Sequence, residues 1–270
     1  MRYESMRTYP LASFLALIAV AIPGTVHSQD DAAADWRLER VEDRDAVLAL
    51  ITFTNGIVLV SRCVAGVYDL TITGLPEPVR DDVFTRQLGF SVGDDAMSES
   101  AWTIADDRTS AFSRLPAVVA RRLAKGGRLQ IRVPADGDRR PTRYIMQLEP
   151  SSAALATTLT ECGRPLVDTR DANIEGDGQS LPSGSTWVRP PQIQFSASNS
   201  TRGRSDVGYV GMTCAVTAEG RLSDCIVESE HPGGFGFGAA VLRGIPRARV
   251  TPRVDGESAV IAFSVNFRID

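Results

Sequence analysis

The sequence predicts an α+β protein in two parts, a β-rich N-terminal domain with one or two helices and a smaller C-terminal domain. Apolar, β-branched runs flank Asn55 and Gly56, which is a strong hairpin signal. The closing run 259–269 alternates apolar and polar residues, as a half-buried strand does. Between them, residues 168–186 are polar, rich in Gly, Asp and Ser, and lack apolar periodicity. We therefore expect domains at 29–167 and 187–270, joined by a linker at 168–186.

The first domain reads as strands interrupted by two helices. A hairpin is predicted over residues 45–63, followed by a strand at 66–75 and weaker strands at 86–92 and 101–105. Residues 113–126 have helical spacing, with Ser113 as the expected cap and Gly126 as the stop. Two alternating strands follow at 128–133 and 143–149, and a helix at 151–163 places Leu155, Leu159 and Cys162 on one face.

The second domain is predicted in the order strand, strand, helix, strand. The run 209–217 places Val210, Met212, Cys214 and Val216 on one face, and Glu219 with Gly220 turns the chain. The returning run 221–229 slips its apolar phase, which indicates a bulge. A short, glycine-rich helix and the closing strand should each bury one apolar face. These residues are Phe237, Ala240 and Val241 in the helix, and Ile261, Phe263, Val265, Phe267 and Ile269 in the strand.

The first 28 residues have the layout of a cleavable secretory signal peptide. Arg2 and Arg7 precede an apolar run at 11–22, and small residues lead to Ser28, after which we expect cleavage. An uncleaved anchor is the alternative, although the apolar run is shorter than the roughly 20 residues of a membrane span. The expected location is the periplasm. The formal net charge of −4 gives no reason to expect nucleic acid as a partner.

Four cysteines are predicted to form two disulfides. An even number in an exported chain is typical of disulfides, and three pairings are formally open. Zinc sites use close cysteine pairs or added histidines, and thiol oxidoreductases use C-x-x-C, neither of which occurs here. If Glu219 and Gly220 form the turn, Cys214 faces Cys225 across a hairpin. Cys63 would then join Cys162.

The sequence shows no catalytic, cofactor-binding or metal-binding constellation, so we predict none of the three and no cofactor. His231 lies in a Pro and Gly turn and is expected to be a solvated loop residue, with no G-x-S-x-G motif to accompany it. The glycine run 233–238 lacks the Lys and Ser or Thr of a P-loop. Three acidic pairs are expected to be solvated turns, namely Asp81 with Asp82, Asp94 with Asp95, and Asp106 with Asp107.

Residues 208–269 resemble the C-terminal domain of the TonB family of energy transducers. The resemblance lies in the turn TAEGRL, the run CIVESEHPGGFGFGAAVLRGI, the segment PRARVTPRVDG and the final VNFRI, in that order. It implies a small periplasmic module that binds a protein partner, such as an outer-membrane transporter segment, by adding a strand at a sheet edge. Two features differ from that family. The N-terminal segment has the layout of a signal peptide where transducers have a membrane anchor, and a folded first domain replaces their Pro-rich spacer.

The predicted function is therefore that of a non-enzymatic periplasmic protein, linked to outer-membrane transport or envelope upkeep, which docks a partner by β-augmentation. An exposed edge could instead be paired in a homodimer. One alternative is an envelope structural factor without energy transduction. Another is a carboxylate-based hydrolase with its site in the N-terminal domain.

Overall fold

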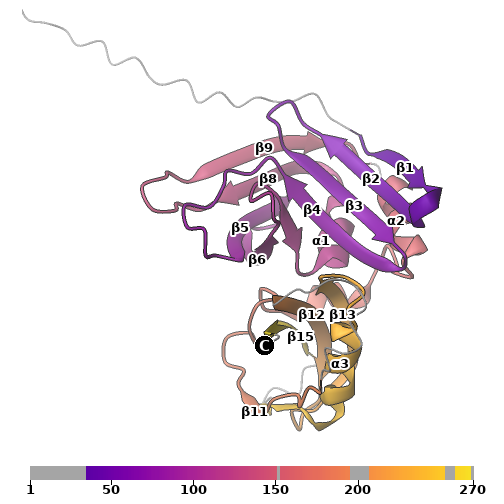
Figure 1. The fold of residues 1–270 in the computed structure, drawn as a ribbon, viewed down its shortest axis with the longest axis vertical. Coiled ribbons are helices and arrows are strands. Elements are labelled where there is room, and N and C mark those ends of the chain that lie inside the picture. The colour runs from indigo at the N-terminus through magenta and orange to yellow at the C-terminus, as the bar shows by residue number, and fades with distance from the viewer. Residues whose placement is uncertain (1–34, 151–152, 195–206, 253–258, 269–270) are drawn as a thin grey trace, which may run out of the picture.

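The computed structural model describes residues 35–150, 153–194, 207–252 and 259–268. The predicted signal peptide and Ile269 lie outside these ranges. Figure 1 shows two bodies, a large sheet with helices and a smaller sheet below it. Each has its own hydrophobic core. The α+β class predicted from the sequence is confirmed.

The first body is a nine-stranded antiparallel sheet in the order β1-β2-β3-β4-β7-β6-β5-β8-β9. Helices α1 and α2 pack against its core, and in Figure 1 they lie behind β3, on the far face of the sheet. The strands are β1 (Arg37–Val41), β2 (Ala46–Thr52), β3 (Val58–Val64), β4 (Val67–Thr73), β5 (Thr85–Val92), β6 (Ser98–Ile104), β7 (Ala111–Ser113), β8 (Gly127–Val133) and β9 (Thr142–Leu148). The helices are η1 (Glu42–Arg44), α1 (Pro116–Leu123) and α2 (Ala153–Glu161).

The predicted hairpin is present as β2 and β3, and Gly56 explains its turn. Gly56 has a φ of +86°, a left-handed conformation that glycine adopts without strain. The Asn55 side chain accepts a hydrogen bond from the Ile57 N–H at 3.1 Å, which holds the loop. Both strands then bury every second residue; in β3 these are Leu59, Ser61 and Cys63.

One helix boundary differs from the sequence prediction. Ser113 is not the cap of α1; it is the last residue of β7, and Leu115 occupies the cap position without a side-chain hydrogen bond. The Ser113 hydroxyl accepts from the Leu115 N–H at 3.2 Å, so it stabilises the bend before the helix. Pro116 begins α1 because its missing N–H and fixed φ suit a first turn.

The second body is a four-stranded sheet in the order β10-β15-β12-β13, with α3 against it. The predicted order of strand, strand, helix and strand appears as β12 (Val207–Val216), β13 (Leu222–His231), α3 (Phe237–Gly244) and β15 (Ala259–Arg268). The predicted bulge is confirmed, since the register of β12 with β13 shifts at two places. A separate two-stranded sheet pairs β11 (Trp187–Arg189) with β14 (Arg249–Val250), and η4 (Ile245–Arg247) follows α3.

The segment predicted as a linker is partly structured. Residues 169–173 form the 3-10 helix η2 (Thr169–Asn173), and β10 (Ile174–Glu175) pairs in parallel with β15. The polar, glycine-rich composition that suggests a spacer is compatible with a short edge strand, because such a strand buries few side chains. The segment therefore belongs to the second sheet as much as it connects the two bodies.

Candidate functional site

Both faces of the second sheet are covered. On one face, Val210, Met212 and Phe263 pack against Phe237 and Val241 of α3. The opposite face of β12 carries Tyr209 and Thr213, which are 5 % and 1 % exposed. This part of the face is buried because it faces the first body, so within the described part of the chain a partner reaches the sheet most directly along its edges.

The covered face is a polar interface between the two bodies. The Arg114 guanidinium carbon lies 4.7 Å from the centroid of the Tyr209 ring. The Ser229 hydroxyl donates to the Arg114 carbonyl at 2.9 Å, and Arg170 donates to the Thr213 hydroxyl at 3.3 Å. Thr213 in turn donates to the buried carboxylate of Glu228 at 2.6 Å. These contacts hold the second sheet in a fixed position on the first body.

His231 belongs to the same interface and is not the solvated loop residue that the sequence predicts. It is the last residue of β13, and its ring lies 5.8 Å from Tyr209 and 5.1 Å from Phe112, centroid to centroid. Burial lowers the pKa of His231, while Asp106 raises it and Arg62 lowers it. The flanking Pro and Gly residues correctly indicate a turn. They cannot indicate the aromatic side chains that contact the ring, because these come from distant parts of the sequence.

The β13 edge is partly occupied. The Val227 carbonyl accepts a hydrogen bond from Arg164. Arg221, directly before β13, forms an isolated backbone β-bridge with Arg249 of β14. At the end of β13, the Glu230 carboxylate accepts from three backbone N–H groups at the start of α3, at 2.7, 3.2 and 3.0 Å. These N–H groups belong to Gly236, Phe237 and Gly238. The glycine run thus forms a turn that lets one carboxylate cap a helix.

The β15 edge is covered along only part of its length. β10 pairs with Val260 and Ile261, and the Ser264 N–H donates to the Gln179 carbonyl at 3.3 Å. Since backbone groups alternate sides along a strand, the N–H and C=O of Asn266 and Arg268 also point outward. Within the described part of the chain, no backbone partner lies opposite them on that side. The outward backbone groups of Asn266 and Arg268 therefore form an open stretch of the β15 edge.

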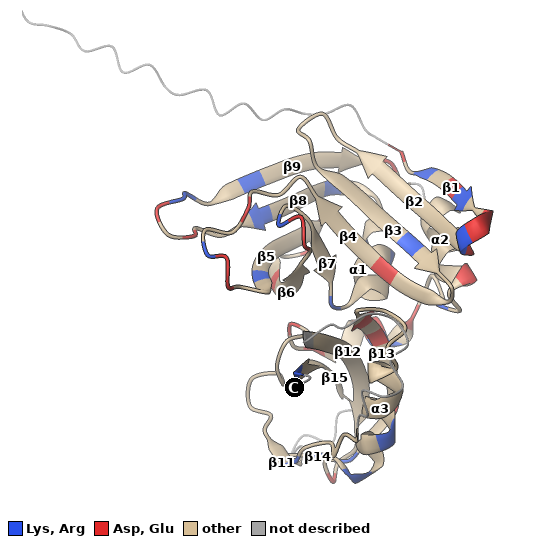
Figure 2. Ribbon diagram, viewed as in Figure 1, with Lys and Arg blue, Asp and Glu red and all other residues tan. Residues whose placement is uncertain are grey.

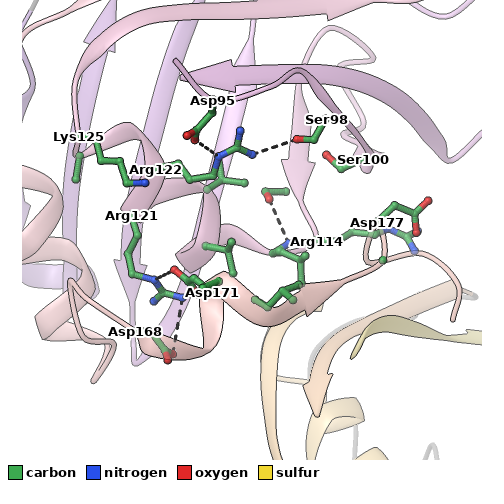
Figure 3. A pocket seen from close by; sticks show the side chains of 18 of the residues that line it. Asp95, Ser98, Ser100, Arg114, Arg121, Arg122, Lys125, Asp168, Asp171 and Asp177 are labelled. Carbon is green, nitrogen blue, oxygen red and sulfur yellow. Dashed lines mark hydrogen bonds and ion pairs between the residues drawn. The ribbon is translucent and has the colours of Figure 1, made fainter. Parts of the chain in front are cut away.

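A cleft of about 840 Å³ lies beside the interface, between α1, β6 and residues 166–177 (Figure 3). Figure 3 shows Arg122 between Asp95 and Ser98, with hydrogen bonds of 3.2 Å to each, and Arg121 directed at Asp168 and Asp171. Other carboxylates of the cleft are also engaged: Glu99 pairs with Arg132, and Asp177 accepts from backbone N–H groups. These carboxylates are therefore engaged in ion pairs and hydrogen bonds that hold the walls of the cleft together.

The remaining predicted residues are also placed. The structure contains the disulfides Cys63–Cys162 and Cys214–Cys225. All six residues of the acidic pairs are exposed, as expected of solvated turns. Among the described residues, no group of three or more His, Cys, Asp or Glu side chains could hold a metal ion. Figure 2 shows both signs of charge around β1 and η1 and in the β8–β9 loop, which differs from the single-sign stripe of a nucleic-acid binder.

The sequence prediction did not include the interface arginines or the edge segment 174–179. Arg114 and Arg121 fall in an amphipathic helical pattern, where arginine usually denotes a solvated face, yet they are 3 % and 8 % exposed. No local signal distinguishes such residues from surface arginines. The pairing of β10 with β15 joins residues far apart in sequence, so it too has no local signature.

None of the helices in the described part of the chain has the length and apolar character required to cross a membrane. No protein-family model matches the chain, and no curated protein matches it. Among solved structures, it is similar to the solution NMR structure of the Pseudomonas aeruginosa TonB CTD, with 22 % sequence identity and a TM-score of 0.25. That similarity covers 33 % of this chain and 87 % of the other.

Proposed function

We propose that this protein is a non-enzymatic periplasmic factor whose second sheet docks an extended segment of a protein partner along the open edge of β15. The observation that supports this most directly is that the outward N–H and C=O groups of Asn266 and Arg268 have no backbone partner within the described part of the chain, while the middle of the sheet is covered on both faces. An unpaired row of N–H and C=O groups is what a partner strand recognises in β-augmentation. The two disulfides suit an oxidising compartment outside the cytoplasm.

The partner class that we propose is an outer-membrane transporter or another envelope protein. It follows from the resemblance of residues 208–269 to TonB C-terminal domains, together with the expected export of the chain. The ion-paired carboxylates of the cleft favour this docking role over a carboxylate-based hydrolase. The proposal assigns docking and not energy transduction; unchanged siderophore uptake in a deletion strain would identify an envelope factor without transduction.

A proline substitution tests the edge directly. Asn266→Pro removes an N–H that points away from β12, and proline is tolerated in edge strands where the lost N–H faces outward. We expect purified wild-type protein and Asn266→Ala to capture the same envelope protein from outer-membrane extracts, and Asn266→Pro to lose it. Equal capture by the proline variant would exclude this edge as the docking site.

A photo-cross-linking residue locates the contact. Placed at Arg268 on the β15 edge, it should link to the captured partner, whereas the same residue at Arg243 on the exposed side of α3 should not. Cross-linking from Arg243 alone would place the binding surface on α3 and contradict the proposal. Cross-links between two copies of this chain from Arg268 would identify a homodimer edge instead.

A further inference from the structure

The chain covers part of its own docking edge. Residues 174–179, here called the edge segment, run along β15 in parallel with it. Ile174 is opposite Val260, and Glu175 is opposite Ile261. Farther along, Ser264 donates its N–H to the Gln179 carbonyl and its hydroxyl to the Gly178 carbonyl. The edge segment thus makes the contacts that an added strand would make.

We propose that the docking edge runs along β15 from residue 260 to residue 268. On the first half of this edge, the edge segment occupies the position that the partner strand would take. The inference rests on the proposed function and specifies it further. It assigns the partner strand a direction, parallel to β15, and it requires the edge segment to leave before the full edge can pair.

The edge segment also indicates which chemistry the edge accepts. Gly176 has a φ of +100°, and a Cβ there would lie 2.7 Å from the Ala262 carbonyl oxygen, so only glycine fits at this point. Ile174, two positions earlier, is half-buried opposite Val260. The two donors of Ser264 require two successive carbonyl groups. The partner that fits is an extended segment with an aliphatic residue two positions before a glycine.

The edge segment can detach without freeing the chain that precedes it. Arg121 donates to both oxygens of Asp171 at 2.5 and 2.7 Å, and the Arg121 side chain is only 7 % exposed. This buried ion pair fixes the chain three residues before Ile174. The tethered segment therefore keeps a high effective concentration near β15 and competes with any strand that arrives from another molecule.

The substitution Gly176→Val tests the competition, because its Cβ would meet the Ala262 carbonyl and displace the edge segment. The probe is a fluorescent peptide of residues 172–181, ANIEGDGQSL, titrated into the full chain. We expect it to bind Gly176→Val at least about tenfold more tightly than wild type, since displacing the tethered segment weakens apparent binding to the wild type. The same peptide with valine in place of the glycine at position 176 is the matched control and should bind neither protein.

Hydrogen exchange of the Ser264 amide provides a second measurement. It should be protected in wild type, exchange faster in Gly176→Val, and regain protection when the peptide is added. Near-ultraviolet circular dichroism checks that the variant is folded. If it is not, Gly176→Ala adds only the Cβ that meets the Ala262 carbonyl and leaves β15 unchanged, and it should shift peptide affinity and exchange in the same direction by a smaller factor.

Equal, weak peptide binding by all folded variants, with unchanged Ser264 protection, would overturn the inference. Failure here differs from failure of the proposed function, because the peptide assay needs no partner. If Arg268 cross-links the partner but the peptide does not bind, docking stands and the edge segment is only a structural strand. If the peptide binds but Asn266→Pro still captures the partner, the edge accepts a strand but is not the partner site.

Discussion

The guanidinium of Arg114 lies over the ring of Tyr209, with 4.7 Å from its central carbon to the ring centroid. Arg114 follows β7 in the first body, and Tyr209 belongs to β12 in the second. Both are almost fully buried, at 3 % and 5 % exposure. A desolvated cation–π contact of this kind contributes about 2 kcal/mol. It therefore couples the stability of the two bodies.

Removal of the Tyr209 ring should uncouple the two bodies. Tyr209→Ala loses the contact with Arg114, His231 and the surrounding interface, at a cost of about 3–5 kcal/mol. We expect wild type and Tyr209→Phe, which keeps the ring, to unfold in one calorimetric transition, and Tyr209→Ala to unfold in two. A single transition in all three proteins would show that the coupling does not depend on this ring.

His231 should make the interface weaker in acid. Burial lowers its pKa below the ordinary 6.5, so the folded state binds the proton less well than the unfolded state. The stability associated with neutral His231 is therefore present above about pH 6.5 and is lost as the pH falls through 6.5 toward the folded value. The ring contacts Phe112 and Tyr209, and the charges of Asp106 and Arg62 act on it in opposite directions.

Urea midpoints between pH 5 and pH 8 measure this loss. His231→Phe should flatten the acidic limb of the stability curve, since it keeps an aromatic ring but has no titratable group. The only other histidine of the sequence, His27, lies in the predicted signal peptide, so the mature protein expected from cleavage has no second histidine that could contribute to this limb. An unchanged acidic limb in His231→Phe would assign the pH dependence to other groups.

Tyr68 should limit stability in alkali. Its side chain is buried, and its hydroxyl hydrogen-bonds to Ser61 at 2.7 Å; burial raises the pKa of Tyr68 to about 12. Because the folded pKa lies above the ordinary value of 10, the contribution is complete below pH 10 and is lost as the pH rises toward 12. The loss should be on the order of 2–3 kcal/mol. Tyr68→Phe should lack it in denaturation experiments between pH 9 and pH 11.5, and an identical alkaline limb in both proteins would contradict the assignment.

Local patterns predicted most of the fold, because they depend on residues close in sequence. The alternation in β3 and β15, the glycine at position 56 and the bulge in β13 each have a local physical cause. Burial of His231 and pairing of β10 with β15 depend on segments far apart in sequence. The proposed docking edge was predictable only as an edge of the second sheet, since which edge remains open depends on the contacts of β10, Arg164 and β14.

Glu230 should stabilise α3 through its carboxylate. It accepts three N–H groups at the helix start, two of them through the same oxygen, where the helix dipole also favours negative charge. Glu230→Gln keeps the shape but leaves one acceptor oxygen, so we expect a loss of about 1–2 kcal/mol in the free energy of unfolding. Glu219→Gln, in an exposed turn, is the matched control and should be neutral within about 0.5 kcal/mol. Equal effects of the two substitutions would show that the cap contributes little.

The two disulfides should differ in their contribution to stability. Cys63–Cys162 closes a sequence separation of 99 residues and ties β3 to the end of α2, whereas Cys214–Cys225 closes a separation of 11 within one hairpin. In the chain-entropy account, the longer loop contributes about 4–5 kcal/mol and the shorter about 3 kcal/mol. The paired alanine variants each delete two sulfur atoms, so their local packing losses are comparable and the difference reports mainly on loop length. Chemical denaturation should therefore rank the Cys63→Ala, Cys162→Ala protein as the less stable, and the reverse order would show that local structure outweighs loop closure.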